Sequence, residues 1–332
     1  MTKSFNGDML RNFDSKNSIL IAYLIMKTLL VILIFIMFPV SAQVATAERV
    51  IFFEWGEGKN QVGLLVDDMP YGPNYYDIDK EGMILISDEF NKCFKKFDKN
   101  GNLIWEIFPE RGKHPGKIVS LKNGNILYSN GFEIIFGNKE GKTIKEIDSK
   151  KFRGIGLKGV DVTDEHIFLT GHRGDVFVFD TTMTLQQQYR RNQLPNPGCF
   201  IINGDFYFVD VRTDRQHISV KKVNYTPTGL AEGFSKAPIL KLPQREGLTA
   251  FRGVDRYGNL YFSTKFSPSE PYLFEKFDPT GKKLGNIKID WQIAHEVFNP
   301  FKVSPEGDIY VLSSNKKGMW IDKYPAYLFD AK

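Results

Sequence analysis

The chain has 332 residues, with 44 Lys and Arg against 39 Asp and Glu, a formal charge of +5, and two cysteines. Charges of both signs are interspersed along it, which is typical of a solvated surface and argues against nucleic-acid binding. Two cysteines without a CxxC motif exclude a disulfide framework and a zinc ribbon. Aromatic residues make up 14% of the chain and glycines number 29, which favours strands and turns over helical bundles.

The N-terminal segment has the pattern of an export signal. Lys27 is followed by the apolar run Leu29–Val40 and then by small residues that fit the signal-peptidase rule. We expect the mature chain to begin at Gln43 or Glu48. Residues 1–25 would then be an extension upstream of a second possible start at Met26.

An alternative interpretation leaves the segment uncleaved. Ile19–Ala42 is an apolar span of about 24 residues, long enough to cross a bilayer roughly 30 Å thick and to tether the protein. Both interpretations place residues 49–332 in the periplasm or outside the cell, and both confine contact with a membrane to this segment.

The first strand candidate is Arg49–Trp55, which reads RVIFFEW. After it comes a unit of four short runs with β character, separated by turns rich in Gly, Asp and Asn. The four runs are Asn74–Ile78, Met83–Ser87, Lys92–Phe97 and Asn102–Ile107. Strands of this length joined by such turns predict an up-and-down antiparallel meander.

Copies of this unit recur along the chain. Aligned on the turn between their first and second strands, the six copies are separated by 42, 41, 39, 54 and 49 residues. Their second strands read MILIS, NILYS, HIFLT, DFYFV, NLYFS and DIYVL. A β repeat with this period predicts a propeller of six four-stranded antiparallel blades, an all-β fold.

The two ends of the repeat array complement each other. The last copy has room for three strands, at Phe301–Ser304, Asp308–Ser313 and Met319–Tyr324, while Arg49–Trp55 is left over at the start. We therefore expect the N-terminal strand to complete the last blade and close the ring, which removes exposed sheet edges. The chain then divides into a signal or anchor segment, residues 1–47, and one propeller domain, residues 48–332.

The unit PNYYDIDKEGMILISDEFNKCFKKFDKNG resembles an NHL-type repeat of the six-bladed, TolB-like propeller superfamily. The resemblance covers about residues 49–326. It implies a scaffold that carries secreted binding modules, lactonases and lyases, so the fold does not determine the function. In gluconolactonase-like propellers a Glu before a Gly-Pro pair binds the metal, whereas Tyr71 precedes Gly72-Pro73 in this chain. Tyr is a poor replacement for a carboxylate at a divalent cation.

The loops of the meander sort onto two faces. Turns between strands one and two, and between three and four, lie on one face and are short and Gly-rich. The loops between strands two and three lie on the other face with the blade-to-blade connections, and are longer and more varied. Variable loops on a rigid scaffold usually carry binding residues, and here they hold more cations and amides than carboxylates. The candidate ligand-binding residues are His172, Arg173, Arg212, Arg215, His217, Arg252 and Lys265.

The sequence favours a binding module over an enzyme. The acidic turns, such as Asp98–Gly101, are expected to bond their own backbone rather than calcium. Single histidines without an HExxH motif and the absence of a GxSxG motif indicate neither a metal site nor a serine nucleophile. We expect no cofactor, no metal and no catalytic residue. The alternatives are a hydrolase or lyase with its site at the mouth of the central channel, using His172 or His217 as a base, and a structural subunit of an envelope complex.

The partner is expected to be a protein or an anionic small molecule or polysaccharide, and the propeller itself is expected to be a monomer. The extra length of blades four and five falls in their second loops, so cations from neighbouring blades would gather in one rim. Cys93 and Cys199 belong to opposite blades and are too far apart to form a disulfide.

Overall fold

The structure is a computed structural model. It describes residues 46–65, 70–79, 81–109, 114–121, 123–129, 133–148, 159–163, 165–171, 175–190, 199–202, 204–210, 217–226, 229–230, 239–243, 247–295, 297 and 300–330. The predicted signal or anchor segment lies outside these residues. Among the described residues, no helix is long and apolar enough to span a membrane.

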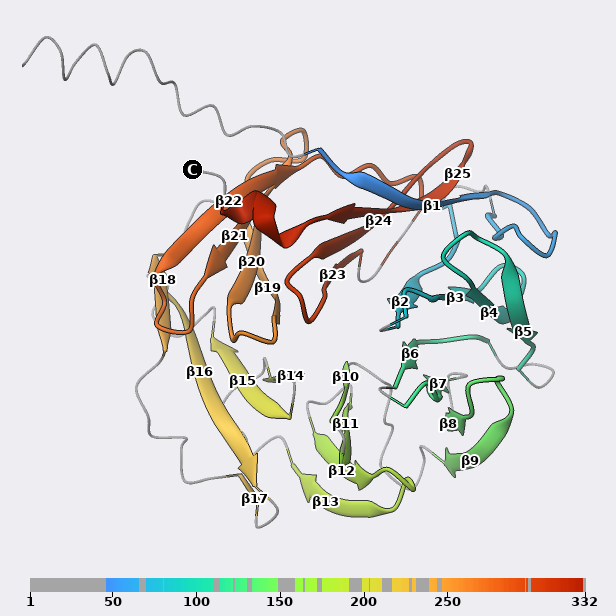
Figure 1. Cartoon of the computed structure of the whole chain (residues 1–332), viewed down its shortest axis with the longest axis horizontal. Coiled ribbons are helices and arrows are strands. Elements are labelled where there is room, and N and C mark those ends of the chain that lie inside the picture. The colour runs from blue at the N-terminus through green and yellow to red at the C-terminus, as the bar shows by residue number, and fades with distance from the viewer. Residues whose placement is uncertain are drawn as a thin grey trace, which may run out of the picture. The chain divides into compact units, whose positions relative to one another are not determined.

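Six antiparallel sheets form a ring, which confirms the predicted six-bladed β-propeller (Figure 1). Blade one contains β2 (Tyr75–Ile78), β3 (Ile84–Asp88), β4 (Cys93–Phe97) and β5 (Leu103–Ile107). Blade two contains β6 (Ile118–Ser120), β7 (Ile126–Ser129), β8 (Glu133–Gly137) and β9 (Thr143–Asp148). Blade three contains β10 (Gly159–Val162), β11 (His166–Thr170), β12 (Val176–Asp180) and β13 (Leu185–Tyr189). In each blade the first strand lies nearest the centre of the ring and the last lies outermost.

The second half of the ring repeats this arrangement. Blade four contains β14 (Cys199–Ile202), β15 (Asp205–Asp210), β16 (His217–Thr226), β17 (Gly229–Leu230) and β18 (Leu240–Pro243). Blade five contains β19 (Leu248–Val254), β20 (Leu260–Lys265), β21 (Tyr272–Phe277) and β22 (Lys283–Ile289). Blade six contains β23 (Phe301–Val303), β24 (Ile309–Asn315), β25 (Gly318–Tyr324) and, from the start of the described chain, β1 (Glu48–Glu54). The 3-10 helix η3 (Ala326–Phe329) follows β25.

The N-terminal strand closes the ring as predicted. β1 is antiparallel to β25, with Phe52 opposite Trp320 and Phe53 opposite Met319. Because β1 and β25 belong to one sheet, the ring has no free sheet edge between its last blade and its first.

Blade four departs from the simple pattern at its outer edge. β16 is ten residues long. Its first part pairs with β18, at Val220 and Leu240 for example, and its last residues pair with the short β17. The outer strand of this blade is thus shared between two separate segments. The sequence predicts four-stranded blades throughout and missed this division of the outer strand.

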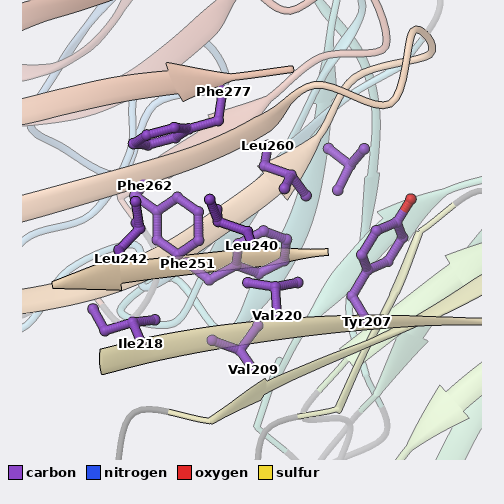
Figure 2. Packing of buried hydrophobic residues seen from close by; sticks show 11 residues of the cluster. Tyr207, Val209, Ile218, Val220, Leu240, Leu242, Phe251, Leu260, Phe262 and Phe277 are labelled. Carbon is purple, nitrogen blue, oxygen red and sulfur yellow. The ribbon is translucent and has the colours of Figure 1, made fainter. Parts of the chain in front are cut away.

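Middle strands are largely buried because each blade packs against a neighbour on both faces. All five residues of β3 and of β4 are buried. Figure 2 shows one such interface, where Val220 and Leu240 of blade four pack with Phe251, Leu260 and Phe262 of blade five. Burial of a side chain of this size contributes about 1.5–3 kcal/mol, so these layers between blades are the hydrophobic core of the ring.

The tight turns have the conformations that their residues predict. Gly101 closes the Asp98 turn with φ of +85°, a left-handed conformation that glycine adopts without steric cost. In blade three the equivalent position is Met183, which keeps φ of +62° although it is not a glycine. The Met183 side chain is buried in the core between blades two and three, and this packing compensates for the less favourable backbone.

Candidate functional site

The antiparallel order of the strands gives the ring two different faces. The turns between strands one and two and between strands three and four lie on one face, which we call the turn face. The loops between strands two and three and the connections between blades lie on the other, which we call the loop face. The longer loop predicted for blade five lies there, between Lys265 and Tyr272.

Carboxylates on the turn face are bound by their own backbone. Asp98 Oδ1 accepts hydrogen bonds from the backbone N–H groups of Asn100 and Asn102, at 2.8 and 2.9 Å. The side-chain amide of Asn102 donates to Asp98 Oδ2 and is the first cause of the lowered pKa of the Asp98 carboxyl. Asp180 and Asp278 hold their turns in the same way. These acidic turns therefore have the structural role that the sequence predicts.

Two of the seven predicted ligand-binding residues can be located with their side chains. His172, Arg173, Arg212 and Arg215 lie outside the described residues. His217 is the first residue of β16, and its side chain is also outside the described part. The structure places Arg252 and Lys265 together on blade five, on neighbouring strands β19 and β20.

Arg252 is the extra residue of a β-bulge in the inner strand of blade five. The register between β19 and β20 shifts between Phe251 and Gly253, and Arg252 falls at this irregularity. Bulges are common beside functional sites because they turn a side chain away from the regular pleat. Here the guanidinium lies over the ring of Phe301 from blade six, 4.8 Å from its centroid, and Nε donates to Ser263 Oγ at 2.7 Å.

Burial lowers the pKa of Arg252 to about 10, and Tyr272 acts in the opposite direction. Among the described residues, no carboxylate forms an ion pair with Arg252. A partly buried cation stabilised by one hydroxyl and one aromatic face is incompletely neutralised. It would be stabilised by an anion.

Lys265 continues this group towards the loop face. Its Nζ lies 4.7 Å from the centroid of the Tyr272 ring and donates to the backbone oxygen of Glu270. Tyr272 in turn packs edge-on against Phe301 at 5.0 Å and against Trp291 at 5.7 Å. We call Arg252, Lys265, Tyr272, Trp291 and Phe301 the blade five–six cluster. It combines two cations with three aromatic rings where two blades meet.

Asn91, between β3 and β4, and Lys95, within β4, have structural roles. Asn91 Nδ2 donates to Asp88 Oδ2 at 2.8 Å and to the backbone oxygen of Gly56 at 3.0 Å. The buried Lys95 lies 3.1 Å from the same Asp88 oxygen and donates to the backbone oxygen of Gln61 at 2.8 Å. This network fastens the segment after β1 onto blade one.

His295 is buried between blade six and blade one as a neutral imidazole. Its Nε2 lies 3.0 Å from the carbonyl oxygen of Pro73, and because a carbonyl only accepts, Nε2 carries the proton. Nδ1 then accepts from the hydroxyl of Ser314 at 3.0 Å, and Ser314 Oγ accepts from the backbone of Ala294 at 2.8 Å. Burial lowers the pKa of His295. With both nitrogens occupied, this histidine holds two blades together and is not placed to act as a base.

A second polar group lies on inner strands and was missed by the sequence analysis. Asp77 in β2, Lys302 in β23 and Lys117, just before β6, belong to the adjacent blades one, six and two. Lys302 Nζ donates to Asp77 Oδ1. The sequence did contain an indication of this group, since each of the three is a charged residue within or beside a short apolar strand. In the structure these strands lie nearest the centre of the ring.

No group of three or more His, Cys, Asp or Glu in the described part of the chain could hold a metal ion. Tyr71 is 39% exposed, and its backbone pairs with Leu65. A pocket of about 200 Å³ lies on the turn face between blades two and three. The described residues of its lining, which include Leu121, Phe136 and Thr163, carry no charge.

Cys93 is a free, buried thiol in β4, and it donates to Glu106 Oε1 at 3.2 Å. Burial raises its pKa well above the ordinary value. Cys199 begins β14 in blade four, on the far side of the ring from blade one, and its side chain is outside the described part.

No family model matches the chain, and no curated protein matches it. It is similar in structure to streptogramin B lyase, at 15% identity over 86% of this chain and 88% of that one, with a TM-score of 0.49. It is also similar to BamB from Moraxella catarrhalis, at 10% identity over 84% and 98% of the two chains, with a TM-score of 0.43. Hydrazine synthase of Kuenenia stuttgartiensis gives 13% identity over 75% and 78%, with a TM-score of 0.47. These similarities assign neither a family nor an activity, and the resemblance to NHL-type repeats stays a prediction.

Proposed function

We propose that this protein is an exported β-propeller that binds an anionic ligand at its loop face, beside the blade five–six cluster. The observation that carries the proposal is the partly buried guanidinium of Arg252, which has no carboxylate partner among the described residues. Its ligand would be an anionic small molecule or polysaccharide, or an acidic surface of another protein.

The cluster offers an anionic ligand both charge and stacking surface. Arg252 has planar N–H donors left beyond the one that bonds Ser263, and Arg binds carboxylate, sulfate or phosphate groups with paired hydrogen bonds. Lys265 supplies a second cation from the neighbouring strand. The rings of Tyr272 and Trp291 add flat apolar surface of the kind found in ligand sites.

The proposed site would extend into a rim through cationic residues that the sequence predicts to bind ligand in blades three and four. His172, Arg173, Arg212, Arg215 and His217 belong to the second loops of these blades or to their edges. Blade four is the neighbour of blade five in the ring. A rim of this sign would attract an extended polyanion.

The test uses the full chain and two probes of known composition, dextran sulfate and polyglutamate. Binding is measured by titration calorimetry at several salt concentrations. We expect affinity to fall with salt, because exposed charges are screened within about 8 Å at physiological ionic strength. The double variant Arg252→Gln with Lys265→Gln should bind at least about tenfold more weakly, since one charge-assisted hydrogen bond is worth about 1.5–3 kcal/mol.

A matched control removes the same charge from the opposite face. Lys139 and Lys142 are exposed residues in a turn of blade two, so Lys139→Gln with Lys142→Gln lowers the net charge equally on the turn face. If both double variants weaken binding alike, the effect is one of net charge and the proposed site is wrong. Arg212→Ala with Arg215→Ala tests whether the rim extends to blade four. It should weaken binding without lowering the melting temperature.

Export rests on the sequence of the N-terminal segment, residues 1–47. N-terminal sequencing of the protein from its producing cell should find a mature chain that begins at Gln43 or Glu48. A retained chain in the membrane fraction would indicate the anchored form. A chain that keeps Met1 and is recovered from the cytosol would refute export in either form.

A further inference from the structure

The inner strand of blade five is longer than its counterparts in blades one, two and six. In these four blades the inner strand ends four residues before the glycine of the first turn. β19 has seven residues, whereas β2 has four and β6 and β23 have three. Even without the bulge residue Arg252, β19 is longer by two or three residues, which is roughly 7–10 Å of strand. Because the turn ends match, the additional length lies at the loop face.

This extension of β19 has one edge without a neighbouring strand. β19 is the first strand of its sheet and pairs with β20 alone among the described strands. Gly247, just before it, packs so tightly that an added Cβ would lie 2.7 Å from the backbone oxygen of Lys265. The chain thus enters β19 against the end of β20, with Leu248 opposite Lys265. A free strand edge presents N–H and C=O groups with which another strand can pair.

Two exposed apolar side chains lie at this end of blade five. Leu248 is 82% exposed, and Phe266, which follows Lys265, is 43% exposed. Residues directly opposite each other in an antiparallel pair have side chains on the same face. Leu248 therefore shares a face with Lys265, whose ammonium group lies over Tyr272. The exposed leucine is thus next to the blade five–six cluster.

Arg252 belongs to the same face of blade five as Leu248. Phe251 packs against residues of blade four (Figure 2), on the opposite face. Arg252 donates to Ser263 Oγ, and Ser263 is opposite Ala250 in the register. Along the free edge, the side that faces blade six therefore presents the exposed Leu248, the small Ala250 and the guanidinium of Arg252.

We propose that the ligand of this site is an extended acidic peptide which adds as a further strand to the free edge of β19. The inference rests on the proposed function and names the class of its ligand. An apolar side chain of the peptide would cover Leu248, and a carboxylate on the same face would pair with Arg252. Because alternate residues of a strand share a face, these two residues would be two or four positions apart in the peptide.

The strand edge favours a peptide over the other anionic surfaces. A peptide strand satisfies the backbone groups of the edge and places alternate side chains on Leu248 and Arg252. A membrane would bury the same N–H and C=O groups in hydrocarbon, where they have no partners. A polysaccharide has neither a regular row of amide groups for the edge nor an aliphatic side chain to cover Leu248.

The test measures binding of synthetic peptides to the full chain by titration calorimetry. The probe is Thr-Glu-Thr-Leu-Thr-Glu-Thr, whose Glu and Leu side chains share one face in either chain direction. Its isomer Thr-Glu-Leu-Thr-Thr-Glu-Thr has the same composition, but a shift of one position moves Leu to the other face. The probe should bind at least about tenfold more tightly than the isomer, because burial of one leucine is worth about that factor.

Methylated forms of the probe test the strand pairing itself. Methyl groups on the Thr nitrogens block one edge of the peptide, and methyl groups on the Glu and Leu nitrogens block the other. We expect one form to lose binding at least about tenfold and the other to keep it, since only one edge of the peptide can face β19. If both forms bind as tightly as the unmethylated probe, no strand is added and the inference is wrong.

Leu248→Ser should abolish the preference for the probe, so that probe and isomer bind within about twofold of each other. The exposed position of Leu248 means that this variant should fold. Leu284→Ser is the matched control, because Leu284 is an exposed leucine on the outer strand β22 of the same blade. This control should keep the preference, and both variants should bind dextran sulfate like the wild type.

The outcomes separate this inference from the proposed function. A protein that binds neither dextran sulfate nor polyglutamate refutes the proposed function. A protein that binds both, but binds probe and isomer equally, refutes the peptide ligand alone. Sedimentation with phosphatidylglycerol vesicles is the last measurement. If the wild type binds the vesicles and Leu248→Ser does not, the exposed leucine serves a membrane surface and the peptide ligand is wrong.

Discussion

The ring of Phe53, in the first strand of the described chain, lies 4.5 Å from the ring of Phe97 in blade one. Phe53 belongs to blade six through β1, so this contact joins the last blade to the first. Both residues belong to one hydrophobic cluster that also contains Ile86 and Leu312. The closure of the ring is therefore held by side-chain packing as well as by backbone pairing.

Replacing Phe53 by Ala should destabilise the propeller by about 3–5 kcal/mol, the usual cost of emptying a buried aromatic site. The matched control is its neighbour Phe52, which points outward and is 42% exposed, whereas Phe53 is 1% exposed. Phe52→Ala should cost much less. Chemical denaturation of the two variants makes the comparison, and equal losses would mean that β1 does not bury Phe53 at the closure.

Removing residues 49–55 should prevent cooperative folding, because it deletes the outer strand of blade six together with Ile51 and Phe53. Domains are stable by only about 5–15 kcal/mol, so the loss of a whole packed strand is comparable with the total. The measurement is the thermal melting transition. A truncated chain that melts like the full chain would contradict closure by this strand.

Replacing Lys95 by Met should destabilise the protein by about 3–5 kcal/mol, since it leaves the buried carboxylate of Asp88 without its cation. Lys139→Met is the control, because Lys139 is 72% exposed and its pairing with Glu140 at 3.8 Å is a surface ion pair worth at most about 1 kcal/mol. Unfolding free energies from denaturant titration test the difference. A Lys95 variant as stable as the control would mean that the network around Asp88 adds nothing to the closure.

Stability should decrease in mildly acidic solution because of His295. Its pKa is lowered in the folded protein, so the unfolded chain binds the proton more readily. The stabilisation is fully present above the unfolded pKa of about 6.5 and is lost as the pH falls below it. His295→Asn should be less stable than the wild type at pH 7.5, with a smaller decline towards pH 5. The slope difference should be at most about 1.4 kcal/mol per pH unit, and parallel curves would exclude His295 as the group.

The thiol of Cys93 should be unreactive in the folded protein. It is buried, it donates to Glu106, and burial is the first cause of its raised pKa, so little thiolate forms at neutral pH. Maleimide labelling followed by peptide mapping should leave Cys93 unmodified in buffer and modify it fully in denaturant. Rapid labelling in buffer would show that β4 opens readily.

Much of the fold could be predicted because its signals are local. The predicted strand Lys92–Phe97 overlaps β4, and each predicted second strand overlaps one in the structure. Turn residues such as Asp98 and Gly101 determine the turn of a hairpin through contacts and backbone conformations that involve only a few neighbouring residues. The outer edge of blade four was not predicted, since residues of β16 pair with residues of β18 that lie 20 to 26 positions further along the chain, and no nearby residue indicates that pairing.

The candidate site was predicted only in part. Arg252 and Lys265 were chosen for their charge and their place in the repeat, and the structure brings them together on neighbouring strands. That Arg252 falls at a bulge and stacks on Phe301 of the next blade could not be predicted, because the sequence pattern gives neither the register nor the packing between blades.

The sequence by itself determined the number of blades, their order and the strand that closes the ring, because alternation and turn chemistry act over a few residues and repeat six times. Only the tertiary structure decided which polar residues meet. Asp77 and Lys302 are 225 residues apart in the chain. They become neighbours because closure places blade six against blade one, and that contact also sets the charge around Lys117.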